Sequence, residues 1–446
     1  MTTAPSHHPR DRLARDLRLR DATLLVVSGV VGSGIFLTPG AIAGILPHAG
    51  LIFAVWIAGG VLSLAGALAN AELGAMYPHA GGDYVYLREA FHPAAGFLVG
   101  WLSFFVIYAG TVATLAAGCA AGVGAFVDLP SGGELSIAVG LTVAVSALNY
   151  VGVRWGARAN NVTAVIKIVA LGGFAVIAPF FGKGDLGNLV GSGEGASAIG
   201  LGAFGLALSP VLFSYLGWNS SIYVASEIRN PGRNVPASLF LGLAICTSLY
   251  LLLNAVYLYA IPVDLLRGTA NAGEATARAM FGGVGGELVG VFVLASILGT
   301  LNATVLVGPR IAYAMALDGL FFRGVDHTHE RFRTPSVAIA VQAVMAVAIL
   351  MSLESFARAL SYTTFAILLA TMADVAALYR LRALEPDRER PYRAWGYPWV
   401  PALYFVACGA IALVLLVEQP VESAVGLAIT ATGLPFYVWF TRQTRG

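Results

Sequence analysis

Long apolar stretches separated by short polar or charged segments dominate this 446-residue chain. A helix needs about 20 mostly apolar residues to cross a bilayer core of about 30 Å. The pattern therefore predicts an all-α integral membrane protein with twelve transmembrane helices. The predicted spans are residues 22–46, 50–76, 94–126, 135–152, 161–182, 198–226, 236–262, 286–316, 335–353, 357–380, 398–417 and 422–441.

The composition agrees with a lipid-facing surface. Hydrophobic residues make up 58% of the chain and charged residues 11%, whereas a soluble domain carries about 25% charged residues. Too few ionisable groups are present to cover a water-facing surface. Cys119, Cys246 and Cys408 lie inside apolar stretches at no metal-binding spacing, so we expect neither a disulfide framework nor a metal site.

The basic residues indicate an orientation in the membrane. The first apolar stretch follows five arginines and is too long for a cleaved signal peptide. With the N-terminus inside, twenty Lys and Arg residues fall on the cytoplasmic side and four on the other side. This asymmetry is typical of plasma (inner) membrane proteins. It places both termini in the cytoplasm, with residues 1–20 and 442–446 as the two tails.

Two of the predicted spans contain helix breakers near the middle. The first carries Gly29, Gly32 and Gly34, each costing a helix roughly 1 kcal/mol relative to alanine. The sixth carries Pro210, which removes a backbone donor, followed by Gly217. Small residues can instead serve close helix packing. Because the two halves of the chain are interrupted at corresponding places, we favour a transporter's binding site at the midplane.

The spacing of the two interruptions predicts an internal repeat. Ser33 and Tyr215 are 182 residues apart, and five predicted spans separate the starts of the two interrupted helices. An odd number of spans in one repeat inverts the next copy in the membrane. We therefore expect inverted repeats at residues 21–182 and 198–381, with the last two spans added in residues 396–441.

An interrupted helix presents groups that suit a zwitterion. Free N–H groups and the positive dipole end of a new half-helix attract a carboxylate, here the amides of Ser33, Gly34 and Ile35 with the Ser33 hydroxyl. The carbonyls of Val30, Phe213 and Leu216, released by interrupted half-helices, are expected to accept from an ammonium group. The predicted substrate-binding residues are Val30, Gly32, Ser33, Gly34, Ile35, Phe213, Ser214 and Leu216.

The residues at these interruptions resemble a known family. Gly32–Phe36 is similar to the first-span signature of the amino acid–polyamine–organocation superfamily. Further stretches resemble its L-type amino acid transporter branch, and together they cover nearly the whole chain. The resemblance implies a five-plus-five inverted-repeat fold, alternating access, amino acid substrates and an aromatic gate at Phe213. These stretches are Ala71–Gly74, Gly81–Tyr84, Phe213–Asn219, Glu227–Pro236, Pro309–Arg310 and Asp318–Phe321.

Lys167 stands out because an ionised lysine inside a span must be paired or hydrated. The alternative is a lysine whose ammonium snorkels to the interface. In the resemblance, Lys167 stands where sodium-coupled relatives bind a cation, which implies that it holds the broken first span against the eighth. Thr300 and Thr304 stand where the family has facing hydroxyls, unless they bond back to their own helix.

Two acidic residues near span ends carry further expectations. Glu227 is expected to join Arg229 and Arg233 in a cytoplasmic ion-pair network, with a gating role as the second interpretation. Asp374 precedes Arg380 by six residues and is expected to be solvated near the inner face.

Two departures from the family pattern bear on substrate and partners. Leu216 replaces a glycine that is usual in animal members, so the pocket is expected to be small. The segment 127–135 contains no cysteine, whereas animal relatives use one there to bond a glycoprotein. We therefore expect no disulfide-linked heavy-chain subunit, and also no nucleic-acid partner and no cofactor.

These observations predict a sodium-independent transporter, most simply an exchanger (antiporter) of small or mid-sized neutral L-amino acids. A proton-coupled symporter, with Lys167 carrying the proton, is the alternative within this class. A membrane enzyme is disfavoured because the chain has no clustered metal ligands, nucleophile elbow or phosphate loop. A channel would not need two interrupted helices in inverted repeats.

Overall fold

The computed structural model describes residues 11–124, 126–181, 183–190, 200–352, 356–418 and 420–445. Within these ranges the chain is helical and forms no strand, and β pairing is limited to two isolated bridges. The predicted all-α class is therefore confirmed. Outside the described residues lie the start of the predicted N-terminal tail (1–10), the predicted boundaries at 182, 198 and 353, and residue 446.

The first half of the chain contributes two long helices and several shorter ones around them. The order is α1 (Leu19–Val30), α2 (Gly34–Leu37), α3 (Pro39–Ile45), α4 (Ala49–Met76), α5 (Asp83–Ala90), α6 (Pro93–Leu102), a π-helical turn η1 (Ser103–Tyr108), α7 (Ala109–Gly124), α8 (Gly133–Tyr150), α9 (Val153–Phe181) and α10 (Gly187–Val190).

The second half follows a similar order of short and long helices. It contains α11 (Leu201–Tyr215), α12 (Ser220–Tyr223), a 3-10 turn η3 (Ala225–Glu227), α13 (Pro231–Ala260), α14 (Val263–Leu266), α15 (Ala272–Phe281), α16 (Gly283–Val307), α17 (Pro309–Leu317), α18 (Ser336–Ser352), α19 (Phe356–Leu384), α20 (Trp399–Glu418) and α21 (Pro420–Arg445).

Nine helical segments in the described ranges are long and apolar enough to cross a membrane. Gly202–Tyr215 and Ser336–Ser352 are shorter apolar helices. Large apolar side chains such as Val169, Phe180 and Leu288 are mostly exposed on the outer faces of these helices. Lipid explains that exposure, since water would penalise it by about 25 cal/mol per Å². The count of twelve spans and the inverted repeat stay predictions.

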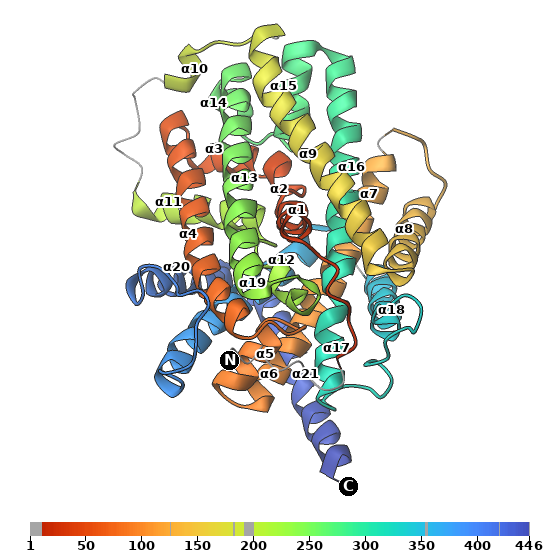
Figure 1. Ribbon diagram of the computed structural model, residues 1–446. Coiled ribbons are helices and arrows are strands. Elements are labelled where there is room, and N and C mark those ends of the chain that lie inside the picture. Colours follow the sequence, from red (N-terminus) through yellow and green to blue (C-terminus); the bar gives the residue numbers. More distant parts are fainter. Residues whose placement is uncertain are drawn as a thin grey trace.

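Helix α1 lies in the middle of the bundle (Figure 1). It packs against α13, α9 and α16, and α13 also packs along α4. Gly242 of α13 permits this approach, because an added Cβ there would lie 2.4 Å from a methyl carbon of Val26. Long helices on every side therefore enclose the interrupted first helix.

Both predicted interruptions are present, and they contact each other. Residues 31–33 separate α1 from α2, and residues 216–219 separate α11 from α12. Gly217 has a φ of +95°, and a Cβ added there would lie 2.7 Å from the Gly29 carbonyl oxygen. The end of α1 and the second interruption thus meet backbone to backbone. Glycine serves close packing at Gly29 and Gly217, as well as the interruption itself.

Candidate functional site

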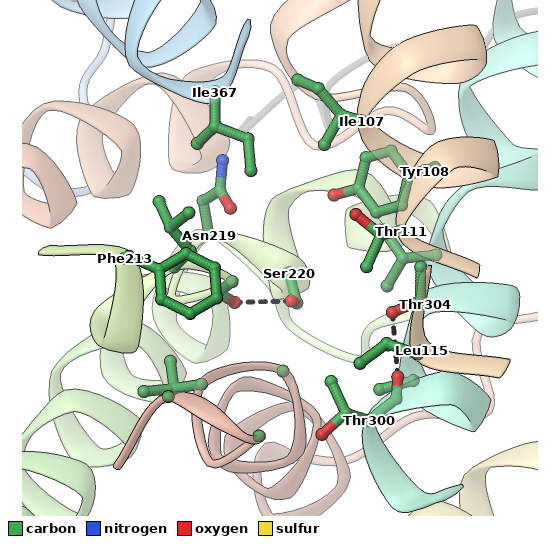
Figure 2. Close-up of a pocket in the computed structure, with 18 of the residues that line it drawn as sticks. Ile107, Tyr108, Thr111, Leu115, Phe213, Asn219, Ser220, Thr300, Thr304 and Ile367 are labelled. Atoms are coloured by element: carbon green, nitrogen blue, oxygen red, sulfur yellow. Dashed lines mark hydrogen bonds between the residues drawn. The ribbon is translucent and has the colours of Figure 1, made fainter. Parts of the chain in front are cut away.

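A cavity of about 120 Å³ lies between the two interruptions, with α7, α16 and α19 completing its wall. Figure 2 shows Phe213 on one side of this space and Tyr108 and Thr111 on the other. Ile35 is buried but does not line the cavity. The other seven predicted substrate-binding residues all line it: Val30, Gly32, Ser33, Gly34, Phe213, Ser214 and Leu216.

The first interruption presents backbone donors to the cavity. Helix α2 begins directly after Ser33, so the N–H groups of Gly34 and Ile35 belong to its first turn, where a helix supplies no acceptor. Gly34 lies so close to α11 that an added Cβ would be 2.7 Å from the Cα of Ser214. A hydrogen bond of 3.0 Å between the Thr38 and Ser214 hydroxyls fastens the same contact.

The carbonyl acceptors are partly used within the protein. The Tyr250 hydroxyl lies 2.8 Å from the carbonyl oxygens of both Val30 and Ser214, so it links the two interruptions. The Phe213 carbonyl accepts from the Leu216 N–H at 3.1 Å. In the described chain no hydrogen bond reaches the Leu216 carbonyl. Of the three predicted ammonium acceptors, Leu216 is therefore the most available.

Lys167 of α9 reaches the first interruption. Its side chain is 1% exposed, and its ammonium group donates to the carbonyl oxygens of Val31 at 2.6 Å and Ser28 at 3.2 Å. It also donates to the Thr300 hydroxyl of α16 at 2.9 Å. The ammonium therefore joins α9, the end of α1 and α16 through three oxygen acceptors.

The two predicted threonines behave differently. Thr300 contacts Lys167 and also donates to the Ser28 carbonyl at 3.0 Å. Thr304 donates to the Thr300 carbonyl of its own helix at 2.8 Å and faces the cavity (Figure 2). The second hydroxyl at the interruption is instead that of Ser296, which donates to Val31 at 3.2 Å. Ser296 precedes Thr300 by one helical turn, a spacing that the sequence displays.

Several cavity-lining residues were not among the predicted ones. Asn219, Tyr223 and Asp83 form a connected series, in which the Asn219 amide donates to the Tyr223 hydroxyl at 3.2 Å and that hydroxyl donates to Asp83 at 2.6 Å. Among the described lining residues, Asp83 is the sole member of the Asp, Glu, Lys, Arg and His set. The sequence signal that could have identified Asp83 was its place in the Gly81–Tyr84 motif.

The expected ion-pair network of Glu227 with Arg229 and Arg233 is wrong. Glu227 is fully buried and accepts two hydrogen bonds from Arg310, at 2.7 and 3.2 Å. Arg229 donates to the Arg15 carbonyl instead. A buried arginine requires a buried carboxylate, so the pairing follows from the position of Arg310 at the start of α17.

The expectation that Asp374 is solvated is also wrong. Its side chain is 0% exposed, and neither carboxyl oxygen has a hydrogen-bond partner within the described chain. Helix α19 extends to Leu384 and packs against α4, α5 and α20. Residue 374 consequently lies inside the bundle, well before the helix ends.

Comparison with known proteins identifies the family. A family model described as "Amino acid permease" matches residues 17–440. The chain belongs to this family. It is 29% identical over 435 residues to the serine/threonine exchanger SteT of Bacillus subtilis (strain 168), covering 97% of this chain and 98% of that protein. It is 30% identical over 452 residues to the cystine/glutamate transporter of Homo sapiens, covering 98% and 87%.

A third relative is similar over the same length. The permease is 28% identical over 446 residues to the b(0,+)-type amino acid transporter 1 of Homo sapiens, covering 97% of this chain and 89% of that protein. The resemblance to the amino acid–polyamine–organocation superfamily is thereby confirmed. The permease is a multi-pass membrane transport protein and not an enzyme.

Proposed function

We propose that this permease is a sodium-independent exchanger of small or mid-sized neutral L-amino acids that works by alternating access. The observation that carries the proposal is the cavity between two interrupted helices. Its walls combine the free N–H groups at the start of α2 with the unbonded Leu216 carbonyl. Such a pair of donor and acceptor groups matches the carboxylate and ammonium of an amino acid.

The size of the cavity supports a small substrate. One water molecule needs about 10–15 Å³ of cavity volume, so a cavity of about 120 Å³ offers roughly ten such positions. Valine has fewer non-hydrogen atoms than the cavity has water-sized positions, and tryptophan has more. The Leu216 side chain takes part of the space beside the proposed ammonium position, and Phe213 is the proposed aromatic gate. SteT, by its name, exchanges serine and threonine.

Sodium independence is supported by the position of the Lys167 ammonium. It lies between the Val31 carbonyl and the Thr300 hydroxyl. The family resemblance puts a bound cation of sodium-coupled relatives at this place. A sodium ion there would have to displace a lysine that already has three oxygen acceptors.

The remaining features of the proposal concern orientation and partners. We propose a plasma-membrane location with both termini cytoplasmic, on the strength of the charge asymmetry, and inverted repeats at 21–182 and 198–381. The buried Glu227–Arg310 pair is the proposed cytoplasmic gate beside η3. The three cysteines are buried and the segment 127–135 contains none, so we propose that no disulfide-linked subunit is attached.

Counterflow into liposomes tests this proposal. Purified permease is reconstituted with one unlabelled amino acid inside, and uptake of labelled L-serine, L-alanine, L-valine or L-tryptophan is measured. We expect uptake of the smaller three only when a neutral amino acid is inside. Uptake into empty liposomes driven by an inward proton gradient would establish the symporter alternative in place of exchange.

A further inference from the structure

Two buried carboxyl groups lie together beside the cavity. Asp83 begins α5 and Asp374 lies in α19, and these helices pack against each other. Asp83 is 1% exposed and Asp374 is 0% exposed. The two carboxyl groups lie close enough to influence each other's protonation. Both are acceptors when ionised, so a hydrogen bond between them requires one of them to carry a proton.

Among the described residues, no cation pairs with Asp83 or Asp374. The other buried acids of the described chain are Glu72, which pairs with Arg382 at 2.6 Å and Arg390 at 3.1 Å, and Glu227, which pairs with Arg310. Within the described part of the chain, the titratable groups near Asp83 and Asp374 are phenols, and an amide completes the surroundings. They are Tyr86 of α5, Tyr108 of η1, Tyr223 of α12, Tyr404 of α20 and the Asn70 amide of α4.

The unsatisfied oxygens indicate what the site binds. Tyr223 donates to one oxygen of Asp83, while the other oxygen of Asp83 and both oxygens of Asp374 have no partner in the described chain. Two adjacent buried charges would repel strongly, and one proton removes a charge and supplies a hydrogen bond. Burial raises the pKa of Asp83 to about 6.

We propose that Asp83 and Asp374 form a proton-binding site that holds one proton while α5 packs on α19 and releases it when the two helices separate. Asp83 lines the cavity together with Thr371, which precedes Asp374 by one turn of α19. The charge of the Asp83–Asp374 pair therefore lies at the wall of the cavity. The proton site itself follows from these contacts, and only its link to transport rests on the proposed function.

Infrared spectroscopy of the purified permease tests the site without any substrate. At pH 7 we expect a protonated-carboxyl absorption that disappears in Asp374→Asn and in the double variant Asp83→Asn/Asp374→Asn. Asp318→Asn is the matched control, because Asp318 already pairs with Arg88, and it should leave the absorption unchanged. A wild-type protein without this absorption, or an absorption that shifts on adding sodium alone, overturns the proposal.

Exchange measured against pH tests the link to transport. One proton permits a change of up to tenfold in rate per pH unit, and we expect wild-type exchange to depend on pH while Asp374→Asn varies less than about twofold. Equal pH profiles in the two proteins would overturn the link. Absence of any amino acid exchange would refute the proposed function, and the infrared result would still decide the proton site.

Discussion

The ammonium nitrogen of Lys167 lies 2.6 Å from the carbonyl oxygen of Val31, the first residue after α1 ends. Val31 has lost its place in a helix, so its carbonyl has no i+4 amide to accept from. The lysine supplies the missing donor and ties α9 to the interruption. This contact connects the shape of the binding site to the Lys167 side chain.

Replacing Lys167 by alanine is expected to reduce exchange at least tenfold. The substitution removes the ammonium donor from the Val31 and Ser28 carbonyls, which keep only the hydroxyl donors of Ser296 and Thr300. A hydrogen bond to a charged group contributes about 1.5–3 kcal/mol. Exchange by Lys167→Ala, the wild type and Lys183→Ala is compared in liposomes. Lys183 is exposed, so its variant should match the wild type, and size-exclusion chromatography should show that all three remain folded.

Amino acids with one charged end blocked are expected to compete poorly for the site. An ester no longer presents a carboxylate to the amides of Ser33 and Gly34, and an N-acetyl group removes the ammonium that the Leu216 carbonyl accepts from. Each unpaired group costs about 1–3 kcal/mol, which is roughly tenfold or more in affinity. Inhibition of labelled L-serine exchange by L-serine methyl ester at the concentration of L-serine itself would refute this assignment.

Gly217→Ala is expected to destabilise the permease by about 1–3 kcal/mol. Gly217 combines a φ of +95° with a backbone contact, because its added Cβ would lie 2.7 Å from the Gly29 carbonyl oxygen. Gly173→Ala in α9 is the control, since nothing lies within 4 Å of its Cβ position. Thermal unfolding in detergent should show a lower midpoint for Gly217→Ala alone. Equal midpoints would show that the two interruptions do not need this close contact.

Leu216→Gly is expected to shift preference toward bulkier amino acids. The leucine lines the cavity, and one or two methylenes of fit are worth about 1–3 kcal/mol in discrimination. The ratio of tryptophan to alanine exchange should rise by roughly tenfold or more. Leu206→Ala in the same region of the chain is a control, because Leu206 is exposed outside the cavity. A wild type that exchanges tryptophan as well as alanine would contradict the proposed size limit.

The helices and their two interruptions could be predicted because their causes are local. Apolar length, glycine and proline act within a few residues of where they stand, and a lone lysine such as Lys167 is conspicuous in an apolar stretch. The same locality explains why Ser33, Gly34 and Leu216, chosen from the interruptions, line the cavity.

The partners of buried polar groups could not be predicted because they depend on packing between distant segments. Glu227 has two arginines close in sequence, yet its partner is Arg310, 83 residues away. Tyr250 is one of several tyrosines in apolar stretches. Its hydroxyl can join the two interruptions only because α13 passes beside both of them. The environment of Asp374 likewise depends on where α5 lies, which no pattern within α19 records.

The most direct test is an experimental structure of the permease with L-serine bound in sodium-free buffer. The account predicts the serine carboxylate at the amides of Ser33 to Ile35, its ammonium at the Leu216 carbonyl, and the Lys167 ammonium still at Val31. Serine bound elsewhere, or binding that appears only when a sodium ion lies between Val31 and Thr300, would contradict it.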